Sequence, residues 1–508
     1  MKPTSETLFQ LVHSLNKNEK GYFVKWASQF KQNRDADYII LFKEIGESDR
    51  YNEDQLKEIM IKKGAKTAFS SLKKYLYDQL LLCLTEYHKH NNTEIQLYVA
   101  LSKIEMLYQK GLYKACYSLI CQTEKKCTDL SLLFRLNVIK NELGRSIQIK
   151  GFPQEHIGKK ILVQEQLIHF TGAINSFLIS SRGLRTKEEK EQVFIIKKKI
   201  KELDFKLIKE DINLNLQFNK VNFLICFIEE QYSFGNICAQ NLKQLLPILL
   251  KRKENEYNPY SIIEIYHYML RSARRLYSFE DVFLIIKELQ NIDIDKIKVP
   301  KTKNYLWNIL AIFKTDALLF TGNIESSLLF STQVINIFPR YIKNVDVIYE
   351  IIHIENHFLA LFLSYQYKNA AKLASRFLIK NELDKRKETI LELWLLLIVC
   401  KIELTEFEQA KKHLYKLEEY TQNDKILIHN NDIKELICLL NIAIKNRTTV
   451  FEAKNPIVQR SLSMLEKKLK TRKYEYLWGV TVWLKSKVEN ITMSQAIKRL
   501  NEVTKSQG

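Results

Sequence analysis

The sequence contains few of the residues that interrupt helices. Glycine occurs 13 times and proline 7 times in 508 residues, whereas the two together make up about 12% of an average protein. Sandwiches, propellers and doubly wound sheets need many tight turns, and this composition disfavours them. The shortage predicts an all-α protein with long helices and short connections.

The sequence also lacks the common motifs of catalysis and cofactor binding. It has no Gly-x-Gly and no Gly-x-Ser-x-Gly, and its nearest approach to a phosphate-binding loop, at 151–160, has the wrong spacing. The eight cysteines form no Cys-x-x-Cys and mostly fall in apolar helical segments, so we interpret them as free thiols. We expect no cofactor and no enzymatic activity. An enzyme with an unrecognised site is a second, weaker interpretation.

One histidine pair has the spacing of a metal site. His353 and His357 lie one helical turn apart, as in helical zinc sites. The zincin motif, however, has glutamate immediately after the first histidine, and here Glu355 comes two positions later, about 100° further round the helix. We therefore predict polar positions on an ordinary helix and no bound metal.

Long apolar runs are missing as well. The most continuous one spans 393–400, which is eight residues, whereas a membrane-spanning helix needs about 18 or more. Residues 1–8 contain no apolar stretch typical of a secretory signal. The sequence predicts no membrane span and a cytoplasmic location.

Positive charge is abundant, with 79 Lys and Arg against 58 Asp and Glu and a formal net charge of +21. Only 17 of the 79 are arginine, the residue that specific nucleic-acid readers use most. Two interpretations stay open. The lysines keep long helices soluble, or they attract a polyanion such as nucleic acid without sequence preference.

Residues 1–90 read as an N-terminal helical module. Two of its expected helices, 53–63 and 67–86, have helix-turn-helix proportions, and the second opens with Lys66, Lys73 and Lys74. These lysines are the candidates for nucleic-acid contact. The competing interpretation is an ordinary helical hairpin with a solvated lysine face, since no Arg, Asn or Gln stands among them to read bases.

After a linker near 88–93, a local pattern recurs through residues 94–450. A turn-tolerant residue is followed two positions later by an apolar or aromatic one, three further on by a small or apolar one, and then by apolar continuations. The small or apolar residue is called the fourth position, because it is the fourth residue counted from the apolar or aromatic one. The first and fourth positions are Gly111 and Cys116, Tyr277 and Val282, Gly322 and Ser327, Tyr365 and Ala370, and Thr405 and Ala410. A small residue early in the second helix would let two helices pack closely.

This pattern resembles the tetratricopeptide repeat (TPR), a helical hairpin with a Gly-x-Tyr/Phe-x-x-Ala core. The last three intervals are 45, 43 and 40 residues instead of 34, so the units are longer than standard, and residues 117–281 give no clean match. The resemblance implies an α-solenoid of about seven hairpins that forms a right-handed superhelix. Residues 456–508 would then be a C-terminal helical cap.

The resemblance also implies a function. Such arrays bind a peptide or a helix of a partner protein in their concave groove, so we expect a non-enzymatic scaffold or adaptor. Arg271, Arg274 and Arg275 are the only tight arginine cluster and are the candidates for lining this groove. A structural ion pair is the competing interpretation of that cluster. The alternative function is a nucleic-acid-associated regulator in which 53–86 contact DNA or RNA and the repeats sense a partner.

Overall fold

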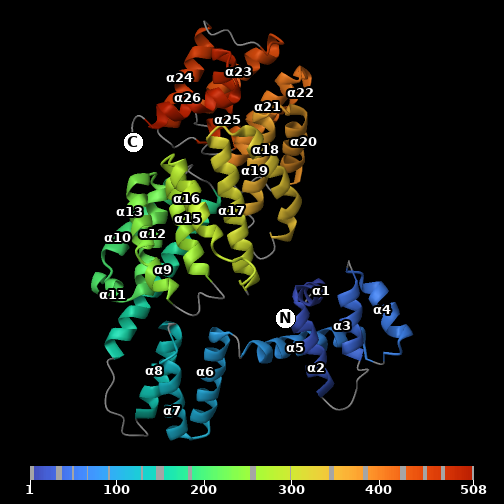
Figure 1. The fold of residues 1–508 in the computed structure, drawn as a ribbon, viewed down its shortest axis with the longest axis vertical. Coiled ribbons are helices and arrows are strands. Elements are labelled where there is room, and N and C mark those ends of the chain that lie inside the picture. Colours follow the sequence, from blue (N-terminus) through green and yellow to red (C-terminus); the bar gives the residue numbers. More distant parts are fainter. Residues whose placement is uncertain are drawn as a thin grey trace. The chain divides into compact units, whose positions relative to one another are not determined.

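The computed structural model describes residues 5–505 apart from 30–36, 49–50, 66, 90–91, 128–129, 145–153, 181–185, 252–258, 298, 342–347, 381–386, 424–430, 450–454 and 471–474. Throughout the described residues the secondary structure is helical, without a β-strand (Figure 1). The all-α prediction is thus confirmed. The chain divides into two compact units, Met1–Ile161 and Leu162–Gly508, and each is described by itself.

The first unit begins with five helices around one core. The helices of this unit are α1 (Ser5–Ser14), α2 (Lys17–Gln29), α3 (Asp37–Glu47), α4 (Glu53–Lys62), α5 (Phe69–His88), α6 (Thr93–Gln109), α7 (Tyr113–Glu124) and α8 (Leu130–Gly144), and α9 (Gln154–Ser180) contains the boundary with the second unit. Helix α5 packs against α1, α2 and α3. Its buried face carries Leu72, Leu76 and Leu80 at helical spacing.

Local signals in the sequence account for where these helices begin. Asn16 and Glu19 form a reciprocal capping box, because each backbone N–H donates to the other side chain at 2.9 and 3.0 Å. Asn52 caps α4 by accepting a hydrogen bond from the backbone N–H of Gln55. Gly64 then ends α4 with a positive φ of 78°.

The second unit is larger. Its helices are α10 (Lys187–Lys201), α11 (Phe205–Glu210), α12 (Ile212–Ile228), α13 (Tyr232–Lys243), α14 (Leu246–Leu250), α15 (Tyr260–Arg275), α16 (Phe279–Gln290), α17 (Pro300–Phe320), α18 (Ile324–Ile337), η2 (Phe338–Arg340), α19 (Ile348–Leu363), α20 (Tyr367–Lys380), α21 (Lys387–Glu403), α22 (Phe407–Asn423), α23 (Asn431–Lys445), α24 (Pro456–Lys470), η4 (Glu475–Leu477), α25 (Trp478–Glu489) and α26 (Met493–Lys505). Helices that follow one another in the sequence mostly pack together.

Six helix pairs across the two units are joined by the same turn. Each of the five first positions predicted from the sequence has a positive φ, from 59° at Tyr277 to 79° at Gly322. The N–H of the next residue donates to the carbonyl five positions earlier, as Asn323 does to Leu318, and the second helix begins two residues after the left-handed one. Such a turn reverses the chain with few exposed backbone groups.

Sequence inspection missed the sixth turn. It lies at Glu230, whose φ is 60°, and it joins α12 to α13 within the stretch that gave no clean match. The fourth position of this turn is Gly235, which is buried against Cys226. Glutamate has no preference for left-handed backbone, so the first position carried no signal.

Burial explains why the fourth position must be small or apolar. Cys116, Val282, Ser327, Ala370 and Ala410 all have 0% of their surface exposed. Each lies one turn inside the second helix, where that helix crosses its predecessor. Larger or charged groups there would force the two helices apart.

The C-terminal helices pack against earlier hairpins as well as against α23. Helix α25 contacts α19 and α21, and Figure 1 shows it beside them. The indole N–H of Trp483 donates to Glu403 at 2.7 Å, and the hydroxyl of Ser494 donates to the carbonyl of Gly322 at 2.8 Å. A Cβ at Gly322 would be crowded, because it would lie 3.2 Å from the Ser494 carbonyl oxygen.

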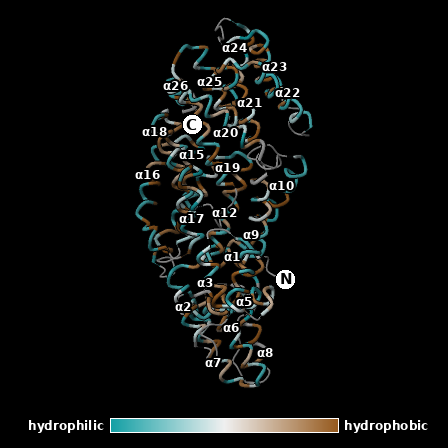
Figure 2. The backbone as a smooth tube through the Cα atoms, turned by 90° about the vertical axis from the view of Figure 1, so that its right-hand side faces the viewer, coloured by the Kyte–Doolittle hydropathy of each residue, from teal (hydrophilic) through white to brown (hydrophobic). Residues whose placement is uncertain are grey.

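Figure 2 shows hydrophobic and hydrophilic residues mixed along the helices. Within the described part of the chain, no helix combines the length and the hydrophobicity that crossing a membrane requires.

Candidate functional site

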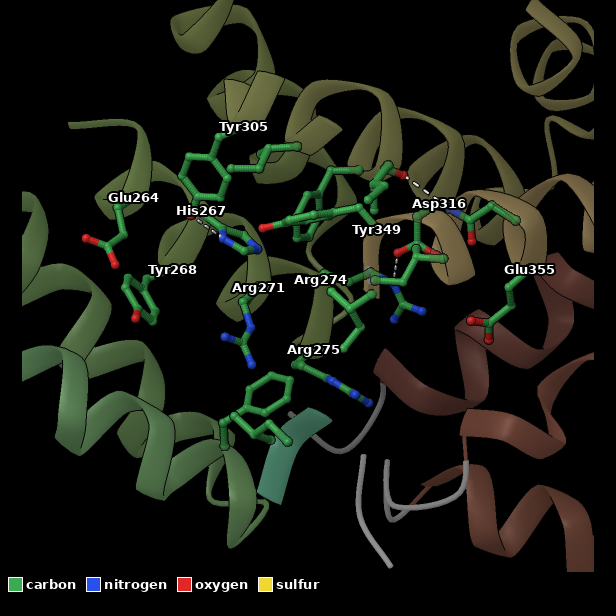
Figure 3. A pocket seen from close by; sticks show the side chains of 18 of the residues that line it. Glu264, His267, Tyr268, Arg271, Arg274, Arg275, Tyr305, Asp316, Tyr349 and Glu355 are labelled. Atoms are coloured by element: carbon green, nitrogen blue, oxygen red, sulfur yellow. Dashed lines mark hydrogen bonds and ion pairs between the residues drawn. The ribbon is translucent and has the colours of Figure 1, made fainter. Parts of the chain in front are cut away.

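The predicted arginine cluster lies on the wall of a cavity of about 680 Å³ in the second unit. Arg271, Arg274 and Arg275 occupy the last turns of α15, and side chains of α17 and α19 form most of the remaining wall (Figure 3). These three are the first helices of successive hairpins, and they pack side by side. Further lining residues come from α9, α12, α21 and α25. The structure therefore brings all three predicted arginines together at one site.

Arg274 has a structural role at this site. Its guanidinium forms an ion pair with Asp316 of α17 and lies 3.6 Å from the ring centroid of Phe320. The side chain is nearly buried, and the ion pair joins the first helices of two neighbouring hairpins. For this one arginine, the competing interpretation of a structural ion pair is correct.

Arg271 has a different environment. Its guanidinium stacks over the Phe227 ring of α12, 4.1 Å from the centroid, and lies 5.6 Å from the centroid of Phe223. Within the described part of the chain, no hydrogen bond or ion pair joins Arg271 to a protein group. Burial lowers the pKa of Arg271, and the nearby charge of Arg275 lowers it further. Arg271 is thus a partly buried cation at the cavity wall, and no carboxylate among the described residues pairs with it.

Arg275 contacts the same ring. Its guanidinium lies 5.0 Å from the centroid of Phe227 and 5.5 Å from that of Tyr232. Two guanidinium groups therefore share one aromatic ring. These contacts hold both side chains at the cavity wall, and among the described residues no acceptor occupies the N–H edge of Arg271.

Polar but uncharged side chains lie around the two arginines. Tyr268 is on α15, Tyr305 on α17 and Tyr349 on α19, and all three line the cavity. The hydroxyl oxygen of Tyr305 is 2.8 Å from Nδ1 of His267. Burial lowers the pKa of His267 to about 3, helped by the charge of Arg271, and raises the pKa of Tyr268 and Tyr305 well above the usual tyrosine value. These groups stay neutral at physiological pH and can exchange hydrogen bonds with a ligand.

Acidic groups line the cavity too, but the described contacts already engage them. Glu264 forms an ion pair with Lys220 of α12, and Asp316 forms one with Arg274. Glu355 of α19 accepts a hydrogen bond from the Thr389 hydroxyl at 3.3 Å. In the view of Figure 3, Glu264 and Glu355 lie at opposite ends of the labelled set, with the arginines between them.

The three lysines predicted to contact nucleic acid belong to the first unit, outside the cavity. Lys66 lies outside the described residues. Lys73 forms an ion pair with Glu53 of α4 at 3.0 Å and lies over the Phe69 ring, so this side chain helps to join the two helices. Lys74 is exposed. A surface hollow lined by Glu44, Glu47 and Glu53 adjoins the start of α4, and its negative charge would repel phosphates.

The two histidines with metal-like spacing each have a protein partner. Nε2 of His353 is 2.8 Å from Oδ1 of Asn308, and Nδ1 of His357 is 3.0 Å from the Ser331 hydroxyl. The first partner is on α17 and the second on α18. The two rings therefore join α19 to its neighbouring hairpin.

Sequence inspection missed most of the cavity wall. Only the α15 face offered a signal, because Glu264, Tyr268, Arg271 and Arg275 follow one another at intervals of four, three and four residues and so share one side of a helix. Tyr305, Tyr349 and Phe227 come from other helices, and nothing local marks them. Comparisons of this chain with known protein families, with curated proteins and with solved structures gave no significant match.

Proposed function

We propose that this protein is a non-enzymatic adaptor, a stack of TPR-like helical hairpins that binds a short segment of a partner protein in the cavity of its second unit. The observation that carries this proposal is Arg271, a partly buried cation that faces the cavity and forms no ion pair within the described residues. A cation held away from bulk water is normally paired. An unpaired one in a cavity is expected at a binding site.

The architecture of the second unit supports the same proposal. Five of the six shared turns lie in this unit, and the cavity is lined mainly by the first helices of three consecutive hairpins. Helical repeat proteins commonly use that face for partners. The TPR-like character itself rests on these turns and on the sequence pattern.

The size of the cavity limits what it can hold. The cavity of about 680 Å³ falls within the range of about 300–1,000 Å³ that ligand pockets have, so we expect only a short segment of the partner to enter.

Affinity capture from the native cell extract, with and without nuclease, tests the proposal. Ile352 lines the cavity on α19, and Ile352→Trp fills part of it. Leu329 is 67% exposed on α18, and Leu329→Trp is the matched control. We expect a partner that resists nuclease and is lost only with Ile352→Trp. A partner retained equally by both variants would contradict binding in the cavity. A partner released by nuclease would favour the alternative function as a nucleic-acid-associated regulator.

A further inference from the structure

We propose that the cavity contains a carboxylate-binding site whose main ligand group is the Arg271 guanidinium, flanked by Arg275. This inference concerns the same cavity as the proposed function, but it needs only a ligand with a carboxylate. The carboxylate can come from an acidic residue of the partner segment or from a free organic acid.

The first argument is the geometry of Arg271. The guanidinium lies over the Phe227 ring, 4.1 Å from its centroid, and this contact helps to hold it in place. The N–H groups lie in the plane at its edge, where a carboxylate binds through two parallel hydrogen bonds. No protein acceptor within the described residues occupies that edge of Arg271.

The second argument is energetic. Burial disfavours the charged form of Arg271, and the positive charge of Arg275 adds repulsion. A carboxylate that entered would neutralise one charge and accept charge-assisted hydrogen bonds from the guanidinium. Binding therefore relieves a cost that the free protein carries.

Arg274 provides an internal comparison. It lies three residues further along the same helix and lines the same cavity, and it also stacks on an aromatic ring, that of Phe320. The protein supplies this arginine with a carboxylate of its own, Asp316. An equivalent acid for Arg271 would have to come from a bound ligand.

The surroundings favour a singly charged carboxylate over a phosphate group. Asp316 and Glu355 line the same cavity, and their charges would repel a phosphate dianion more strongly than a carboxylate. The protonated hydroxyl of Tyr268 is a hydrogen-bond donor that suits a carboxylate oxygen.

Paired acid and amide probes test this site on the full-length protein. The small probes are glutarate and its diamide. The peptide probes are the acetylated, amidated pentapeptide Ala-Leu-Glu-Leu-Ala and its glutamine counterpart. We expect saturating glutarate to raise the melting temperature by about 3–8 °C while the diamide has no effect. For a peptide source, the glutamate peptide should bind at least about tenfold more tightly than the glutamine peptide in calorimetry.

Two variants assign the preference to Arg271. Arg271→Gln should abolish the preference for acid over amide, and Arg271→Lys should retain part of it because the charge remains and the planar fork is lost. Arg447, which is 72% exposed in its ion pair with Glu408, gives the control Arg447→Gln, which should behave like wild type. Circular dichroism checks that each variant is folded.

The outcomes separate this inference from the proposed function. Glutarate binding without binding of either peptide would support the carboxylate site and contradict a peptide partner. Equal binding of both peptides, with no effect of glutarate, would leave the adaptor function standing and overturn the carboxylate site. Failure of all four probes, or an acid preference that persists in Arg271→Gln, would also overturn it.

Discussion

The N-terminal helices α1–α5 and the cavity helices α15, α17 and α19 have opposite interiors. Among the described residues of α1–α5, every buried side chain is hydrophobic, as in Leu76 and Phe23. The buried positions of the cavity helices include polar or charged groups such as Arg274, Asn308 and His353. An apolar interior needs only packing, whereas each buried polar group needs a partner. Arg271 is partly buried at the cavity wall and lacks a protein partner among the described residues, so it is the informative case.

The largest effect is expected from removing the acid of the structural ion pair. Asp316→Ala deletes the carboxylate that pairs with buried Arg274, and breaking such a pair typically costs about 3–5 kcal/mol. Hydrogen–deuterium exchange of peptides from α15 and α17 measures this loss of stability in the two helices themselves. A local measurement is needed because the two compact units need not unfold together. Unchanged protection of both helices would show that the pair is not structural.

A comparable loss is expected in the apolar interior, by a different mechanism. Leu80→Ala on α5 removes a fully buried side chain and leaves a cavity, which typically costs about 2–5 kcal/mol. Protection should fall in α1–α5 while the melting-temperature response to glutarate remains. Loss of that response would contradict the assignment of ligand binding to the second unit.

Acid should affect the two interiors differently. The pKa of His267 is lowered to about 3 and that of His353 to about 4, both mainly by burial. In the unfolded chain these histidines take up a proton near pH 6.5, whereas in the folded chain they do not. The free energy of unfolding therefore falls as the pH falls from about 6.5 towards 3. Each histidine lowers it by at most about 1.4 kcal/mol for each pH unit. Exchange rates at pH 7 and pH 5 should differ more for α15 and α19 than for α5. His267→Asn should reduce the difference in α15.

Smaller effects are expected at the shared turns. Thr405 has a φ of 59°, which costs a β-branched residue about 1 kcal/mol relative to glycine. Thr405→Gly should therefore stabilise the α21–α22 hairpin by up to about 1 kcal/mol, and Gly322→Ala should destabilise its own hairpin, because Gly322 has both a positive φ and a crowded Cβ position. Hydrogen-exchange protection of the helices on either side of each turn measures both changes in stability. A Thr405→Gly variant with weaker protection would contradict the strain at this turn.

The sequence allowed prediction of the fold class and of turns that depend on local chemistry. Gly111 and Gly322 mark left-handed positions directly, and Tyr365 was found through the small Ala370 that follows it. The turn at Glu230 was missed although Tyr232 and Gly235 stand two and five positions after it, because glutamate at the first position does not favour left-handed backbone. Arg271 was predicted because three arginines lie on one helix, but its freedom from an acidic partner depends on α12, α17 and α19. Contacts between helices about 40 residues apart leave no local pattern in one sequence.

The central claim is that Arg271 serves a ligand and not the fold. Arg271→Met keeps the aliphatic stem and removes the charge. Exchange protection of α15 in the free protein should stay within about 0.5 kcal/mol of wild type or increase, because the change leaves no described carboxylate without its partner. The response to glutarate should disappear in the same variant. A loss of about 3 kcal/mol or more in α15, the size expected for Asp316→Ala, would contradict the account, because it would show that Arg271 is as structural as Arg274.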